Sequence, residues 1–227
     1  MKRMEVLDVW RSLSFAAMIV HHLCYDLEHF GVLAAGTMAS LPLRALSWVC
    51  GGSFILLSGA CARFSRSGVR RGFVVLCVGA LVAAVTAMVQ LPVRFGILQM
   101  LGVSMIAYAL LRHRLERFLG WPFALVCVVL FALSEWVTSS VWVDINFLYP
   151  FGFRTREFYS SDYYPLLPWG FLFLIGACFG KYIEKHADHP LLQRSFPAAL
   201  TFVGRHSLLI YVLHQPLLYG ACFLLFG

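Results

Sequence analysis

The first hydrophobic segment of the chain, residues 7–30, carries a row of ionisable residues along one side. At about 100° per residue, Arg11 and His22 differ by only about 20° around a helix axis, and Asp26 follows His22 by one turn. Ionisable side chains inside a bilayer cost roughly 2.5–3.5 kcal/mol each, so such a row should face protein or water. A histidine with a carboxylate one turn away suits a general base. The spacing predicts His22 as a catalytic base oriented by Asp26; the alternative is a polar seam that holds a helix bundle together.

Asp8 and Arg11 lie near the end of this segment that follows the N-terminus. A guanidinium at that place suits an anion arriving from the cytoplasm, because arginine stays charged and offers phosphate a planar fork of donors. Arg11 is therefore assigned to the binding of an anion, and Asp8, three residues before it, is assigned to the same binding site. His21 lies about 100° from His22 around the helix, so we expect it to pack or to lie at the membrane interface.

A second row of polar residues lies on the last hydrophobic segment, residues 199–225. It comprises Ser207, Tyr211 and His214 at helical spacing, with Gln215 directly following. His214 falls near the middle of the membrane by residue count. We expect this row to line the same cavity as His22 and to contact the substrate. The structural alternative is a histidine that is bonded to a neighbouring helix.

The loop over residues 139–164 ends in a carboxylate among aromatic residues. Asp162, Tyr164 and Trp169 are assigned to the binding of a polar substrate on the outer side. Two prolines at the entrance of the next helix restrict the backbone there. An interfacial aromatic belt is the alternative explanation for the rings, but it does not explain Asp162.

The loop after the second hydrophobic segment contains four arginines, Arg63, Arg66, Arg70 and Arg71. Arginine side chains bind phosphate groups through charge-assisted hydrogen bonds. We assign these four to a phosphate-bearing ligand. The alternative is the general excess of basic residues in cytoplasmic loops.

The elements that must position these residues are apolar helices. The chain is 60% hydrophobic and 13% charged, with a mean hydropathy of +0.78, which is typical of polytopic membrane proteins. Apolar runs of about 20 residues are long enough to cross the bilayer as helices. Seven such runs are predicted: 7–30, 41–62, 72–91, 96–111, 118–138, 165–182 and 199–225. We therefore expect an all-α bundle of about seven transmembrane helices in a single domain over residues 1–227.

The distribution of basic residues predicts the orientation of this bundle. With the N-terminus in the cytoplasm, only Arg44, Arg94, Arg154 and Arg156 lie outside, and the other fourteen of the 18 Lys and Arg residues lie inside. This is the positive-inside pattern, and it predicts an N-in, C-out protein of a cytoplasmic membrane. The net charge of +7 therefore reflects topology, and no nucleic-acid partner is expected.

The seven cysteines all lie in apolar segments without paired spacing in any loop. They are expected to be small buried side chains, neither a disulfide framework nor a metal site. No metal cofactor is predicted. The basic start and the long first segment favour a signal anchor over a cleaved signal peptide.

The combined motifs resemble the transmembrane acyltransferase superfamily, in the branch of the heparan-alpha-glucosaminide N-acetyltransferase catalytic domain and its small bacterial relatives. Arg11 and His22 are separated by ten residues, as in the superfamily. The further matching blocks occur in the family's order over nearly the whole chain: 7–11 (LDVWR), His22 with Asp26, 54–59 (FILLSG), 95–99 (FGILQ), 162–169 (DYYPLLPW) and 204–216 (GRHSLLIYVLHQP). The chain departs from the pattern at Ser12, where relatives commonly have Gly, and at Gln99, where many have His or Asn.

The resemblance implies an acyl-CoA-dependent O- or N-acyltransferase of the bacterial inner membrane. The acyl group, usually acetyl, passes from cytoplasmic acetyl-CoA to a hydroxyl or amine of an extracytoplasmic sugar or glycan. By the same resemblance His22 is the catalytic histidine and Arg11 helps to hold the CoA. His22 either deprotonates the acceptor or accepts the acyl group itself, and both routes stay open, as does assembly into a homo-oligomer.

Three other classes of protein use similar residues. A proton- or ion-coupled transporter of small solutes also places His, Asp and Arg inside the membrane, but seven spans do not divide into two equal repeats. A haem-binding electron carrier would use His22 and His214 as axial ligands. A non-catalytic assembly subunit is the third alternative.

Overall fold

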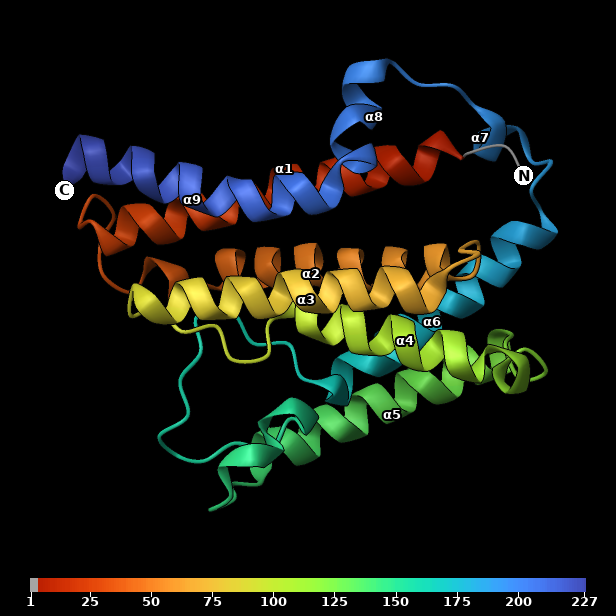
Figure 1. The fold of residues 1–227 in the computed structure, drawn as a ribbon, viewed down its shortest axis with the longest axis horizontal. Helices are drawn as coiled ribbons and strands as arrows, with labels where there is room; N and C mark the ends of the chain where they lie inside the picture. Colours follow the sequence, from red (N-terminus) through yellow and green to blue (C-terminus); the bar gives the residue numbers. More distant parts are fainter. Residues whose placement is uncertain (1–3) are drawn as a thin grey trace. The chain divides into compact units, whose positions relative to one another are not determined.

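A computed structural model describes residues 4–227. Within this range no β-strand forms, and only an isolated bridge joins Trp142 to Arg154. The prediction of an all-α protein is confirmed. Lys2 and Arg3, which enter the charge count above, lie outside the described residues. The elements, shown in Figure 1, are α1 (Glu5–His29), η1 (Thr37–Ala39), α2 (Leu41–Ala62), α3 (Gly68–Met88), α4 (Ile97–Leu115), α5 (Trp121–Ser140), η2 (Asn146–Phe151), α6 (Leu166–Lys185), α7 (Pro190–Gln193), α8 (Ala198–Arg205) and α9 (Ser207–Phe226).

Five of these helices are long and apolar enough to cross a membrane by length and composition, namely α2, α3, α5, α6 and α9. The two other long helices, α1 and α4, contain 25 and 19 residues. They are more polar, since α1 begins with Glu5 and Asp8 and α4 ends in Arg112 and Arg114. The chain is a polytopic helical membrane protein, whereas the count of seven spans stays a prediction.

The helices group into two compact units. One consists of Met1–Phe54 and Ala187–Gly227, and the other of Ile55–His186. Helix α2 contributes residues to both units. The prediction of a single domain over residues 1–227 stays a prediction.

In the unit formed by the two ends of the chain, α1 packs against α8 and α9. Helix α1 ends at His29, and Gly31 follows with φ at 73°, a left-handed conformation that glycine adopts without a steric penalty. The carboxylate of Glu28 then accepts hydrogen bonds from the N–H groups of Gly36 and Met38 at 3.0 and 2.6 Å. The pairing of α1 with α9 brings together the two polar rows found in the sequence.

The last hydrophobic segment, predicted as one run over residues 199–225, is two helices. It breaks at His206, whose φ and ψ are −109° and 25°, and Figure 1 shows α8 turning away from the line of α9. The reason lies in contacts that are distant in sequence. Arg205 donates to Glu5 at 2.8 Å, and Gly204 lies so close to α1 that a Cβ atom there would collide with the carbonyl oxygen of Asp8.

In the unit Ile55–His186, α3 packs along α4 and α5 along α6. Small residues allow the first pair to approach closely. A Cβ atom on Gly102 would lie only 2.8 Å from the backbone nitrogen of Leu76, and one on Gly72 would lie 2.9 Å from the carbonyl oxygen of Gly102. The short loop between α2 and α3 is thereby fixed beside the last turns of α4.

Candidate functional site

Four of the predicted site residues come together where α1 meets α9. The ring centroids of His22 and His214 are 5.1 Å apart. One turn further along, the side-chain amide of Gln215 donates to Asp26 Oδ1 at 2.9 Å. We call His22, Asp26, His214 and Gln215 the α1–α9 cluster. Helical spacing on two segments almost 190 residues apart therefore predicted side chains that are neighbours in space.

The tautomer of His214 follows from its contact with its own helix. Its Nδ1 lies 2.6 Å from the carbonyl oxygen of Tyr211, and because a carbonyl oxygen only accepts, Nδ1 must donate. In a neutral ring Nε2 is then an acceptor. This Nε2 is buried and has no hydrogen-bond partner among the described residues.

Two more acceptors of the α1–α9 cluster are unsatisfied. Asp26 is 0% exposed; its Oδ1 binds Gln215, but its Oδ2 is buried without a partner in the described chain. The Gln215 amide must turn its nitrogen toward the carboxylate, which leaves Oε1 as a third buried acceptor without a described donor. Buried polar atoms without partners are uncommon and costly. Three of them beside His22 suit a ligand that carries O–H or N–H groups.

Aromatic side chains pack beside the cluster, and among them Phe15 had not been indicated by the sequence motifs. Phe15 is buried on α1 and packs its ring against Phe54, with centroids 4.6 Å apart. It also lies 6.4 Å from the rings of both Tyr211 and His214. Tyr211 therefore lies beside the cluster, while Ser207 begins α9 one turn earlier. Contact of either residue with a substrate stays a prediction.

The structure bonds Asp26 Oδ1 to Gln215 rather than to His22. The orienting effect of Asp26 on His22 therefore stays a prediction. His21 lies next to His22 on the helix with ring centroids 5.6 Å apart, which makes it a matched control for any substitution of His22.

Asp8 and Arg11 lie together where α1 meets α8. Arg11 Nη1 donates to Asp8 Oδ1 and to the carbonyl oxygen of Gly204, both at 3.2 Å. Ser12 supports the same contact, because its hydroxyl accepts from the Gly204 N–H at 2.9 Å and donates to the Asp8 carbonyl at 3.0 Å. The residue that departs from the family pattern therefore helps to fix α8, a role that spacing alone did not reveal.

Asp162 lies in the other unit, at the start of α4. Its Oδ2 accepts from the backbone N–H of Ile97 at 3.1 Å, where a carboxylate is favoured by the exposed N–H groups of a helix N-terminus. Burial raises the pKa of Asp162 to about 6, and the bond from Ile97 opposes that shift. Tyr164 and Trp169 pack together nearby in the sequence, with ring centroids 4.9 Å apart. Contact of these three residues with a substrate stays a prediction.

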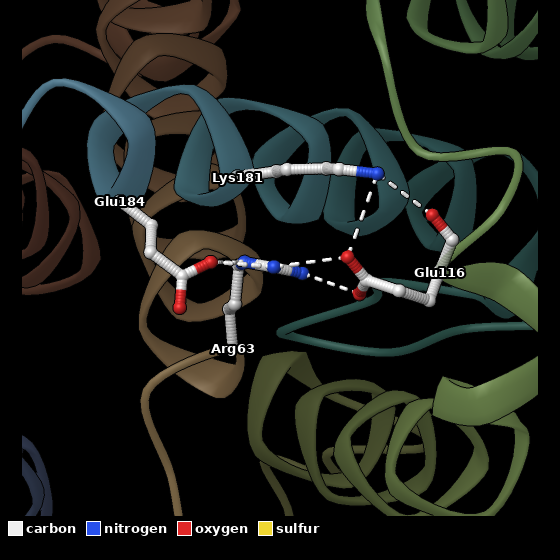
Figure 2. A network of polar contacts seen from close by, with 4 residues as sticks. All are labelled: Arg63, Glu116, Lys181 and Glu184. Atoms are coloured by element: carbon white, nitrogen blue, oxygen red, sulfur yellow. Dashed lines mark hydrogen bonds and ion pairs between the residues drawn. The ribbon is translucent and has the colours of Figure 1, made fainter.

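Arg63 is held in an ion-pair network with Glu116, which directly follows α4, and with Glu184 on α6 (Figure 2). Its guanidinium binds both oxygens of Glu116 at 2.6 and 3.0 Å and donates from Nε to Glu184 at 2.6 Å. Lys181 adds a contact of 3.4 Å to Glu116. These carboxylates raise the pKa of Arg63, and the Arg63 bonds lower the pKa of Glu116. The sequence around Arg63 did not indicate that Glu116 and Glu184 are its ion-pair partners.

The other three loop arginines are placed differently. Arg66 and Arg70 line a pocket of about 310 Å³ between the start of α3 and the last turns of α4, whereas Arg71 is exposed and is not among the lining residues. Arg112 lines the same pocket from α4. Among residues 4–227, no group of three or more His, Cys, Asp or Glu side chains is arranged to hold a metal ion.

A model of a known protein family matches nearly the whole chain. The family model described as heparan-alpha-glucosaminide N-acetyltransferase, catalytic, matches residues 3–216. No curated protein and no solved structure shows significant similarity. The matched range contains both polar rows, the α2–α3 loop and the loop before α6. The chain therefore belongs to the family of heparan-alpha-glucosaminide N-acetyltransferase catalytic domains, and it is an integral membrane protein of acetyltransferase type.

Proposed function

We propose that the protein transfers an acyl group, in the first place acetyl, from acyl-CoA to a hydroxyl or amine of a sugar or glycan. The observation that supports this most is the α1–α9 cluster. It places three buried, unsatisfied acceptors beside two imidazole rings. A sugar offers O–H and N–H donors to such acceptors, and an imidazole takes the proton of the group that reacts.

The proposed reaction moves one acyl group and one proton. The acceptor oxygen or nitrogen attacks the thioester carbonyl carbon, and a C–O or C–N bond forms while the C–S bond breaks. A ring nitrogen of His22 takes the proton from the attacking group, and that proton ends on the departing thiolate. In the other order His22 attacks the thioester first and then passes the acyl group on. Both orders require His22.

The family match makes a glucosaminide amine the first acceptor to test. Purified protein is incubated with radiolabelled acetyl-CoA and a glucosamine-terminated saccharide. Release of free CoA thiol that depends on the saccharide, together with label in the saccharide, is the expected result. No acceptor-dependent thiol release with any amino sugar or hydroxyl sugar contradicts the proposal.

For the donor we propose binding by Asp8 and Arg11, which are held together where α1 meets α8. Arg11→Ala should weaken acyl-CoA binding by roughly 1.5–3 kcal/mol, as for a lost charge-assisted hydrogen bond. Calorimetry on the folded variant measures this affinity.

Ser12→Ala is the matched control for Arg11→Ala. It also removes a bond between α1 and Gly204, but it keeps the guanidinium. Equal losses of affinity in the two variants, or none in Arg11→Ala, contradict a donor role for Arg11.

Asp162 is proposed to contact the acceptor on the outer side. Since burial raises the pKa of Asp162 to about 6 in the folded protein, the folded state binds the carboxyl proton more tightly than the unfolded state. The stability gained from this proton is fully present below the ordinary pKa of 3.8. It is lost as the pH rises through about 6. Asp162→Asn should remove this dependence, a change of about 1–2 kcal/mol in unfolding free energy for a partly exposed group. The Michaelis constant for the acceptor, but not that for acetyl-CoA, should rise.

Unfolding measured between pH 4 and pH 7 checks the stability part, with the exposed loop residue Asp144 changed to Asn as the control. An identical pH dependence in Asp162→Asn and in the wild type rules out the stability account. If Asp162→Asn changes the affinity for acetyl-CoA and leaves the Michaelis constant for the acceptor unchanged, Asp162 does not contact the acceptor.

The protein is proposed to lie in a bacterial cytoplasmic membrane with its N-terminus inside and its C-terminus outside. In a cysteine-depleted background, Ser67→Cys should react only with reagents that enter the cytoplasm, because it lies in the arginine-rich loop. Glu157→Cys should react with reagents that stay outside. Labelling of either residue from the opposite side refutes this orientation.

A further inference from the structure

The pocket between the start of α3 and the end of α4 is positively charged. Arg66, Arg70 and Arg112 line it, and its lining contains no acidic residue. None of the three arginines forms an ion pair with a carboxylate among the described residues, in contrast to Arg63 nearby. Arg66 and Arg70 are exposed and Arg112 is partly buried, and an anion in this pocket of about 310 Å³ is attracted by all three cations.

Two buried hydroxyl groups in the lining of this pocket have no partner. Tyr108 is 3% exposed and Ser65 is 9% exposed, and neither Tyr108 Oη nor Ser65 Oγ has a hydrogen-bond partner in the described chain. The Arg63 guanidinium lies close to the Tyr108 hydroxyl and interacts with it electrostatically, but the N–H groups of Arg63 make their hydrogen bonds to Glu116 and Glu184, and Ser65 Oγ has no such neighbour among the described residues. A buried hydroxyl without a partner is unfavourable, and an anion with several acceptor oxygens would satisfy both.

The backbone adds a third kind of anion contact. Ser67 and Gly68, which lie in the lining, are the N-cap and first residue of α3, a helix of 21 residues. Its first N–H groups have no partners within the helix and carry the positive end of the helix dipole. Cations, hydroxyl donors and helix N–H groups together form the donor set that phosphate groups bind.

We infer that this pocket binds the phosphate of a phosphate ester, presented by the headgroup of an anionic phospholipid. Helix α3 favours the lipid as the source of that phosphate, because its membrane-length window is apolar and only 11% buried. Acyl chains can therefore run along α3 while the headgroup occupies the pocket at its start. Basic pockets between helices on the cytoplasmic side are typical sites for anionic lipid headgroups. A phosphate group of acyl-CoA could occupy the same pocket. Only this alternative ligand depends on the function proposed above.

The test compares variants of the full-length protein in bilayers of phosphatidylcholine with phosphatidylglycerol. Phosphatidylglycerol that stays bound is measured by native mass spectrometry after release from the bilayer. Tyr108→Phe removes only the unpartnered hydroxyl, so the fold is kept, and retention should fall roughly tenfold. Arg112→Gln should lower it by at least as much.

Arg114→Gln is the matched control, since it makes the same charge change two residues further along α4, at an exposed residue outside the lining. It should retain the lipid as the wild type does. In a second arm, binding of CoA to protein in detergent without anionic lipid is measured by calorimetry. Loss of CoA affinity in Tyr108→Phe and Arg112→Gln with unchanged lipid retention confirms the phosphate pocket but makes the donor its source.

Two results overturn the inference. One is that both variants keep wild-type affinity for phosphatidylglycerol and for CoA. The other is that Arg114→Gln loses as much lipid as Arg112→Gln, which indicates non-specific charge attraction. Neither measurement involves turnover, so the binding of phosphate in this pocket and the catalytic role of His22 are tested independently of each other.

Discussion

His22→Ala should lower the rate of acyl transfer by ~100- to 10,000-fold, the usual contribution of a general base, with acyl-CoA binding nearly unchanged. His22 is the catalytic candidate because it lies beside His214 and one turn before Asp26, where three buried acceptors lack donors. A base that acts only in the transition state affects the rate and leaves ground-state binding intact. Turnover and CoA affinity are measured on the same folded preparation.

Asp26→Asn should reduce the rate less than His22→Ala, because the carboxylate acts through its neighbours and is itself bonded to Gln215. If the two residues work as a unit, the double variant should be little slower than His22→Ala alone. His21→Ala is the control: it removes the adjacent imidazole and should keep most activity. Strong activity in folded His22→Ala ends this mechanism, and a loss in His21→Ala alone moves the base by one residue.

The second large effect is expected for stability. Arg63→Met should lower the free energy of unfolding by about 3 kcal/mol, near the lower end of the effect of breaking a buried ion pair. The Arg63 side chain is 8% exposed, whereas those of Glu116 and Glu184 are 40% and 42% exposed. The two carboxylates can therefore regain water when the guanidinium is removed. Denaturant unfolding in a fixed detergent measures the loss.

Arg117→Met is the control, because it makes the same change at an exposed arginine beside Glu116. It should stay within about 0.5 kcal/mol of the wild type, as most surface substitutions do. Equal stability of Arg63→Met and Arg117→Met contradicts the account of this network.

The Arg63 network also predicts an acid dependence. Because Arg63 lowers the pKa of Glu116 in the folded protein, the stabilisation is present above the ordinary value of 4.5 and is lost as the pH falls through the lowered pKa. In Arg63→Met the acid dependence contributed by Glu116 should be largely absent. If the free energy of unfolding of Arg63→Met falls with decreasing pH as it does in the wild type, the pKa of Glu116 does not depend on Arg63.

Hydrophobic runs predicted the long helices because a bilayer allows few other structures. Helical spacing predicted the polar faces of α1 and α9, which do lie together through His22 and His214. The break at His206 was missed because its cause is a contact with Glu5 and Asp8, about two hundred residues earlier in the chain. An apolar run alone contains no sign of such a contact.

The partners of individual charged residues were the least predictable part. Arg63 appeared equivalent to Arg66 and Arg70 in sequence, but only Arg63 meets the carboxylates of Glu116 and Glu184. Those partners lie 53 and 121 residues away, and their proximity depends on how three helices pack. Tyr108 and Ser65 likewise become candidates only once their hydroxyls are seen to be buried without partners.

Transfer of labelled acetyl groups into sealed proteoliposomes tests the central claim most directly. Vesicles contain a glucosamine-terminated saccharide inside, and acetyl-CoA labelled in the acetyl group is added outside. Label should accumulate inside on the saccharide while CoA thiol appears outside in equal amount, and His22→Ala vesicles should show neither. Two results would contradict acyl transfer by His22. One is the appearance of intact labelled acetyl-CoA inside the vesicles without release of CoA thiol. The other is equal transfer of label by wild-type and His22→Ala vesicles.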